Sequence, residues 1–168
     1  RGISLTVEPG VTVNVGASGE IRVLGQFIAI GTNNQKIIFK TNWNRPLLVS
    51  SRGSGAESIS LRFTEIHDFS NLVIKAGSST IEIQDSLIKN VQGDTSNVGG
   101  SFTASRNVFE NSGGVHISGG MARLMNNCFV GRPPILYQSY SSFAGSKIHL
   151  NSIYGVSAGL HPGSLRVG

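Results

Sequence analysis

Short runs in which apolar and polar residues alternate recur along the whole chain. They cover residues 5–7, 11–15, 21–23, 37–39, 59–63, 81–83 and 147–150. Alternation with a period of two predicts short strands that bury one face. A cluster of Gly, Ser or Asn follows each run, which favours a turn. No long stretch keeps apolar residues at helical spacing without interruption, so the pattern predicts an all-β protein.

A repeated segment sets the spacing of these runs. The fourth residue of this segment is apolar each time, and we call it the anchor of the repeat. The anchors are nearly evenly spaced and are Ile66, Ile88, Phe109, Phe129 and Tyr154. Upstream, Phe39 precedes Phe63 and Val15 precedes Phe39 at a similar spacing. A period of this length, on the order of two dozen positions, that holds several short strands is typical of one coil of a parallel β-helix.

Stacking explains how such a chain would form a core. One coil cannot bury its own apolar face, but coils stacked about 4.8 Å apart shield one another and pair their backbone groups. We predict one domain over residues 1–168, a single-stranded parallel β-helix (a β-solenoid) of about seven coils with three strands each. Residues 155–168 are expected to form an irregular C-terminal tail. A β-sandwich is disfavoured because Asn-Gly and Asp-Gly hairpin turns are absent.

Three segments also carry a family resemblance. Residues 5–13, Leu-Thr-Val-Glu-Pro-Gly-Val-Thr-Val, resemble the first-coil signature of right-handed parallel β-helix proteins of the pectin-lyase-like superfamily. Residues 29–39 resemble the end of that coil, and residues 107–111, Asn-Val-Phe-Glu-Asn, resemble its later repeats. The resemblance implies a right-handed coil, of the surface or phage-tail type. It does not imply one activity, because the group includes lyases, glycosidases, phage tail proteins and non-catalytic surface domains.

Charge is unevenly distributed along the chain. The 14 Lys and Arg residues outnumber the 9 Asp and Glu residues, and no acid follows Glu110. A basic end can attract an anionic glycan or an acidic protein surface. We interpret the excess as spread around a solvated perimeter, because the bases are scattered, and we do not expect nucleic acid as a partner. An interaction protein that binds nucleic acid through the basic end is kept as a third interpretation, which a salt-dependent affinity for DNA or RNA would distinguish from glycan binding. No apolar run approaches the roughly 18 residues of a membrane span, so no membrane association is expected.

The two ends of the predicted stack need cover. The chain opens directly in strand pattern, without a signal peptide or an amphipathic helix that could cap a coil. Exposed strand edges invite aggregation. We therefore expect this chain to be a segment of a longer protein, or its ends to be covered by flanking domains or a homo-oligomer. The expected location is extracellular, on a cell surface or on a virion.

Stacking also places polar residues of successive coils side by side. Asp85 and Arg106 are expected to form an ion pair across adjacent coils, in a column that runs Phe63, Asp85, Arg106, Asn126, Asn151. A second column, Asp68, Asn90, Asn111, Gly131, is expected to be a structural ladder at a turn. Asn107 and Asn127 are candidates for a further ladder.

An enzymatic interpretation is kept as the alternative. A lyase or glycosidase acting on acidic polysaccharide would use Asp85, Asp94 and Glu110 with Arg106, and a lyase would also require Ca²⁺. The chain lacks the Asp-Asp pair, the Gly-His-Gly and the Arg-x-Lys of the family's enzymes. Otherwise no cofactor and no metal are expected, because the four His residues lack ligand spacing. Cys128 is expected to be an inert thiol in the core.

Aromatic residues near Arg132 suggest a binding surface instead. Tyr137 and Tyr140 follow Arg132 in a long excursion between anchors, and Trp43 lies in a second loop. Such side chains can stack on sugar rings or dock a protein. We therefore expect a non-catalytic structural or adhesion protein that binds glycan, with Trp43, Arg132, Tyr137 and Tyr140 as ligand-binding residues.

Overall fold

A computed structural model gives the structure of most of the chain. It describes residues 3–16, 19–41, 47–50, 57–69, 74–77, 79–91, 96–98, 100–113, 115–117, 121–131, 136–138 and 147–154, with the backbone alone at residues 50, 75–76, 96–98, 115–117, 136–138, 148 and 153. The described residues contain twenty strands and no helix. No described segment is therefore a helix that could cross a membrane. The tail predicted at residues 155–168 lies outside these ranges.

The strands form three sheets. The first sheet contains β1 (Ser4–Val7), β4 (Gln26–Ile30), β7 (Ser58–Arg62), β10 (Thr80–Gln84), β13 (Ser101–Ser105), β16 (Ala122–Met125) and β19 (Lys147–His149). The second contains β2 (Thr12–Asn14), β5 (Ile37–Lys40), β8 (Thr64–His67), β11 (Leu87–Lys89), β14 (Val108–Glu110), β17 (Cys128–Val130) and β20 (Ser152–Tyr154). The third contains β3 (Ile21–Arg22), β6 (Leu48–Ser50), β9 (Ile74–Ala76), β12 (Ser96–Val98), β15 (Val115–Ile117) and β18 (Leu136–Gln138).

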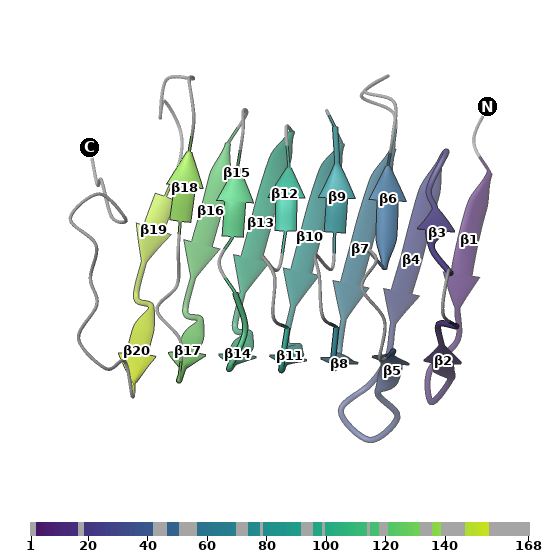
Figure 1. Cartoon of the computed structure of the whole chain (residues 1–168), viewed down its shortest axis with the longest axis horizontal. Coiled ribbons are helices and arrows are strands. Elements are labelled where there is room, and N and C mark those ends of the chain that lie inside the picture. Colours follow the sequence, from purple (N-terminus) through teal and green to yellow (C-terminus); the bar gives the residue numbers. More distant parts are fainter. Residues whose placement is uncertain are drawn as a thin grey trace.

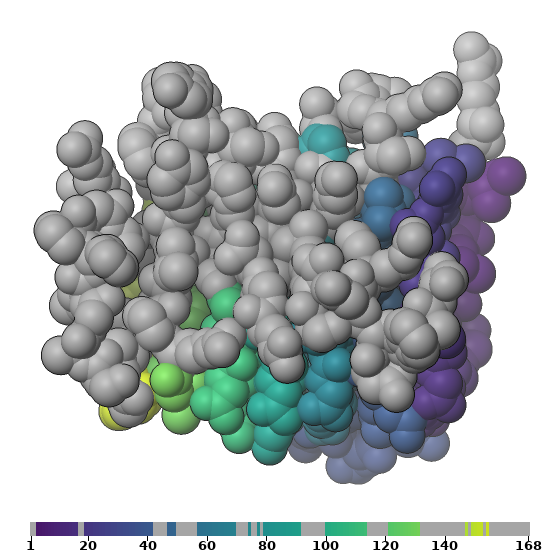
Figure 2. All heavy atoms as spheres, viewed as in Figure 1, coloured from purple at the N-terminus to yellow at the C-terminus, as the bar shows by residue number. Residues whose placement is uncertain are grey.

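Every strand pairs with the strand three places away in the chain, and every described pairing is parallel. Three consecutive strands therefore make one coil, and each coil lies against the next (Figure 1). The colours of Figure 2 follow the sequence along the longest axis of the molecule, as a stack of coils requires. The predicted all-β parallel β-solenoid is confirmed.

The core lies between the sheets and is built from in-register columns. Ile66, Ile88, Phe109 and Phe129 occupy equivalent positions of β8, β11, β14 and β17, and all four are buried. The rings of Phe109 and Phe129 stack with their centroids 4.7 Å apart. Four of the five predicted anchors are therefore correctly placed.

The fifth anchor is wrong. Phe129 pairs with Ile153, whereas Tyr154 pairs with Val130 and is 59% exposed. The error is a shift of one residue: the corner position of the last coil is held by Leu150, not by Asn151. A match between two Asn residues favoured the wrong alignment.

The upstream part of the predicted series is also out of register. Phe39 pairs with Ile66 rather than with Phe63, and Val13, not Val15, pairs with Phe39. Phe63 is a corner residue with a positive φ of 48°, in the column with Asp85 and Arg106 as predicted, so it cannot also be the anchor equivalent to Phe39. Its apolar side chain suggested an anchor in the core. Its left-handed backbone instead places it between two strands, at the turn from the first sheet to the second.

Single left-handed residues turn the chain from one sheet to the next. From β7 onward, those between the first and second sheets are Phe63, Asp85, Arg106, Asn126 and Leu150, with φ between 48° and 57°. Between the second and third sheets they are Asp68, Asn90, Asn111 and Gly131. Gly131 has a φ of 84°, which glycine adopts at no steric cost, and a side chain there would first have to displace the Asn111 amide, whose Oδ1 lies 2.1 Å from the position of a Cβ.

Cys128 does not belong to the core. It is a free thiol on the outward side of β17, beside Val108 and Ser152, and it is partly exposed. Phe129 next to it takes the inward position, because successive side chains of a strand point to opposite faces. The expectation of a core thiol is therefore wrong.

Candidate functional site

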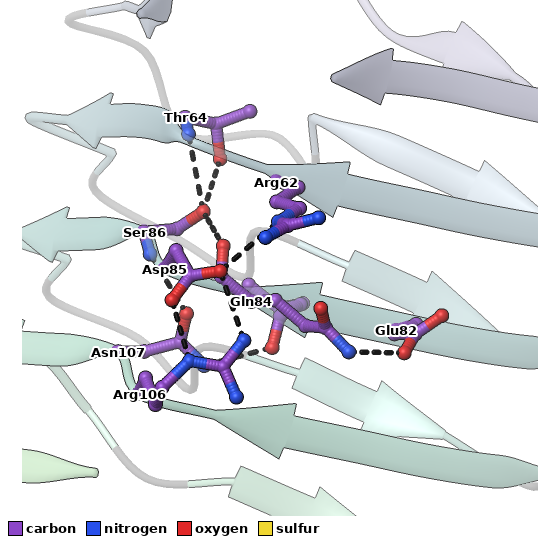
Figure 3. A network of polar contacts seen from close by, with 9 residues as sticks. Arg62, Thr64, Glu82, Gln84, Asp85, Ser86, Arg106 and Asn107 are labelled. Carbon is purple, nitrogen blue, oxygen red and sulfur yellow. Dashed lines mark hydrogen bonds and ion pairs between the residues drawn. The ribbon is translucent and has the colours of Figure 1, made fainter. Parts of the chain in front are cut away.

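Asp85 connects three successive coils at the corner between the first and second sheets. Arg106, from the next coil, donates two hydrogen bonds to it, from Nε to Oδ1 at 2.6 Å and from Nη2 to Oδ2 at 2.9 Å. Arg62, from the preceding coil, donates from Nε to Oδ2 at 3.0 Å. Figure 3 shows the two guanidinium groups on either side of the carboxylate. The predicted Asp85–Arg106 ion pair is confirmed, and Arg62 is an additional partner.

The two arginines hold Asp85 in its ionised form. Hydrogen bonds from Arg106 lower the pKa of Asp85, burial opposes this shift, and Arg62 adds to the lowering. In return, Asp85 raises the pKa of Arg106. The Asp85 side chain is 16% exposed, and its two oxygens are both occupied as acceptors. This environment suits a charged cross-link, whereas a general acid needs a raised pKa.

A polar ladder runs inside the stack next to this corner. Oδ1 of Asn127 accepts hydrogen bonds from the backbone N–H of Asn107 at 3.1 Å and from Nδ2 of Asn107 at 3.0 Å. Asn127 donates in the same two ways to Oδ1 of Asn151, at 2.9 and 3.0 Å. Asn107 in turn accepts from the backbone N–H of Ser86, whose hydroxyl accepts from Thr64 (Figure 3). The ladder therefore joins five coils.

The sequence identified only part of this ladder. Asn107 and Asn127 were predicted, and the structure confirms them. Asn151 was placed in the neighbouring column because of the shift of one residue in the last coil. Ser86 and Thr64 share the column but not the residue type, so only the correct register could have revealed them.

The column Asp68, Asn90, Asn111, Gly131 lies at the corner between the second and third sheets, as predicted. All four residues have positive φ. Nδ2 of Asn90 donates to Oδ1 of Asp68 at 3.0 Å. Asn and Asp tolerate this backbone conformation better than most residues, which accounts for their place here.

The remaining residues of the enzymatic set do not join Asp85. Glu110 stands at the opposite end of β14 from the Arg106 corner, and its carboxylate pairs with Nζ of Lys89 at 3.1 Å. Asp94 lies outside the described residues. The structure thus brings Asp85 and Arg106 together and gives Glu110 a different partner.

Most of the predicted ligand-binding set lies outside the described residues. This applies to Trp43, Arg132 and Tyr140. Tyr137 belongs to β18, where its backbone is paired with that of His116, but its side chain is not among those described. Their proposed role stays a prediction.

A shallow groove borders the Asp85 corner on the outward face of the first sheet. Ile30, Ser60, Arg62, Glu82 and Gln84 line it, and its volume is about 180 Å³. Glu82 accepts a hydrogen bond from Gln84 (Figure 3). Among the described residues, no group of three His, Cys, Asp or Glu side chains could hold a metal ion.

Comparisons of the chain with known protein families, with curated proteins and with solved structures give no match. The residues themselves therefore carry the functional argument.

Proposed function

We propose that this chain is a non-catalytic structural or adhesion segment of the pectin-lyase-like type of right-handed β-helix, exposed on a cell surface or virion and able to bind glycan. The observation that carries this proposal is the use of polar side chains as cross-links between coils. Both carboxylate oxygens of Asp85 accept hydrogen bonds from arginines of the two neighbouring coils.

The buried amides support the same role. A polar group in a core costs free energy unless it is hydrogen-bonded. The amides of Asn107 and Asn127 each donate to a backbone carbonyl of the preceding coil, Ile83 and Ala104, and to the side-chain oxygen of the next coil's Asn. Such a ladder favours one register of the stack over others. A fixed register suits a rod that must keep its shape under load.

The geometry gives less support to the enzymatic alternative. A glycosidase uses two carboxylates about 5 to 9.5 Å apart beside a cleft. Asp85 lies at the corner after β10, whereas Glu110 ends β14 in the next coil, and each carboxylate is neutralised by a basic partner. This arrangement favours stability over proton transfer.

The proposal is tested by measuring binding and turnover on the same ligands. The protein is applied to an array of neutral and acidic glycans, and each bound glycan is then incubated with it in Ca²⁺ and in EDTA. We expect binding without new reducing ends or unsaturated products in either condition. Product formation that Asp85→Asn abolishes would overturn the proposal in favour of an enzyme.

The predicted aromatic residues enter this test as variants. Trp43→Ala, Tyr137→Ala and Tyr140→Ala are expected to weaken binding to the glycans that the array identifies, since stacked aromatic rings contribute favourable contact with sugars. Unchanged binding in all three variants would remove these residues from the site.

A further inference from the structure

Two basic side chains stand next to each other on the outward face of the first sheet. Arg123 of β16 and Lys147 of β19 are paired in register, so they occupy adjacent rungs of one column. Both side chains are exposed, as is that of His149, two residues after Lys147 on the same face of β19. The three side chains, called the basic row below, lie at the C-terminal end of the described stack.

The charge of the basic row is not neutralised by the described residues. The ion pairs among the described residues use Glu20, Glu65, Asp85 and Glu110, and none of these pairs includes Arg123 or Lys147. In the column of Arg123, the nearest acid is Glu82, two rungs away beyond Thr103.

Two adjacent cations such as Arg123 and Lys147 lower the stability of the fold when no anion lies between them. Adjacent rungs are about 4.8 Å apart, and like charges directly opposite each other on neighbouring strands repel. The Asp85 corner shows how this fold neutralises cations, since there one carboxylate lies between two arginines. In the part of the chain that the structure describes, the basic row has two adjacent cations but no carboxylate between them.

We infer that the basic row binds the sulfate group of a sulfated polysaccharide. This inference rests on the proposed glycan-binding function and names its ligand class and its location. A sulfate presents three oxygens in a tetrahedral arrangement, so it can accept hydrogen bonds from donors that approach from separate points. Arg123 and Lys147 are such donors, because they project from different rungs.

The surroundings of the basic row suit a sugar chain. Asn126 is exposed at the corner next to β16, and Thr103 is partly exposed in the column beside Arg123. An amide and a hydroxyl can hydrogen-bond to sugar hydroxyls on either side of a bound sulfate. The face is the outer surface of a sheet, so an extended polymer can lie across the rungs.

The test compares dextran sulfate with uncharged dextran by titration calorimetry on the whole chain. Arg123→Gln with Lys147→Gln is the test variant. Arg22→Gln with Lys40→Gln is the control for net charge, because it removes two positive charges from the N-terminal half of the stack, where Arg22 pairs with Glu20. We expect the test variant to bind dextran sulfate at least tenfold more weakly, the control to bind within twofold of the parent, and dextran not to bind.

Salt dependence gives a second measurement. Each phosphate or sulfate contact that releases a counterion steepens the dependence of affinity on salt, so the test variant is expected to show a shallower slope than the control. Circular dichroism of both variants confirms that they keep the strand content of the parent. Equal weakening in the test and control variants would overturn the inference, because it would mean that only net charge matters.

Two further ligands separate the alternatives. Binding of single-stranded DNA as tight as that of dextran sulfate, and equally dependent on Arg123 and Lys147, would replace the inference by a nucleic-acid site. Preference for polygalacturonate would replace sulfate by carboxylate and likewise overturn it. If the array finds only neutral ligands without turnover, the inference fails and the proposed function stands, whereas turnover defeats the proposed function itself.

Discussion

Neighbouring asparagines have opposite roles in this protein. Asn126 takes the left-handed corner, with a φ of 55°, and its side chain is exposed. Asn127 points inward, is buried, and hydrogen-bonds to the coils on both sides. Residue type alone does not distinguish them, because Asn is favourable both in a left-handed turn and in an amide ladder.

Removal of the buried amide is expected to be costly. Asn127→Ala leaves the backbone N–H of Asn107 and the carbonyl of Ala104 without their partner inside the core. We expect a loss of about 2 to 3 kcal/mol in the free energy of unfolding, measured by urea denaturation. The control is Asn126→Gly, which keeps the corner conformation and should cost less than about 0.5 kcal/mol. Similar losses in both variants would contradict the ladder.

Asp85 makes stability depend on pH in one direction. Its pKa is lower in the folded protein than the usual value of about 3.9 for an unfolded chain. As pH falls, the unfolded state takes up the proton first. The stabilisation is therefore complete above the unfolded pKa and is lost as pH falls through the folded pKa.

Asp85→Asn is expected to remove this contribution. At neutral pH the variant should be less stable by about 1 kcal/mol, because the exposed guanidiniums lose a screened ion pair. Below about pH 4 the difference from the parent should shrink. Thermal melting of the parent and the variant at several pH values measures this difference in stability. Glu82→Gln, a carboxylate on the same face whose described partner is Gln84, is the control; a parallel pH response in both variants would contradict the role of Asp85.

At the scale of the element, alternation decides which side of each strand is buried. In β14, Phe109 is 2% exposed and Val108 is 39% exposed, although both are apolar. The sequence predicted the inward position correctly here because Phe109 recurs at the repeat spacing. The prediction of the buried side was wrong at Cys128, because this apolar residue faces outward next to the true anchor, Phe129.

A pair of truncations in β14 tests this assignment. Phe109→Ala would leave a cavity between Ile88 and Phe129 and is expected to cost about 3 to 5 kcal/mol. Val108→Ala removes an apolar side chain from the same strand and should cost less than about 1 kcal/mol, because that side chain is partly solvated. Urea unfolding of both variants provides the comparison, and the reverse order would contradict the side of the strand assigned to the core.

The backbone conformation of the corners was harder to predict than their position in the chain. Phe63, Arg106 and Leu150 adopt a left-handed backbone although none of these residue types favours it. Tertiary stacking imposes the conformation, because each corner must follow the one beneath it. Only Asn, Asp or Gly indicates such a conformation locally, whereas Phe63 and Arg106 were placed in the corner column by their spacing from Asp85. The registers of the first two coils and of the last coil were misassigned.

At the scale of the whole molecule, the solenoid converts sequence separation into short distances. Asp85 and Arg106 lie 21 residues apart in the chain but in contact in space. This pair could be predicted because both residues lie in the corner column. Arg62 could not, because it belongs to the strand position just before the corner, and only its long side chain brings it to Asp85.

The stacking of coils in register is the claim on which every site depends. The most direct measurement is cross-linking of cysteine pairs on the outward face of the first sheet, in a Cys128→Ser background. Ser60→Cys with Glu82→Cys, and Glu82→Cys with Thr103→Cys, join adjacent rungs, whereas Ser60→Cys with Thr103→Cys spans two. We predict that a short thiol reagent links both adjacent pairs, about 5 Å apart, and not the pair about 10 Å apart. Equal linking of all three pairs, or of the distant pair alone, would contradict the stacked, in-register coils.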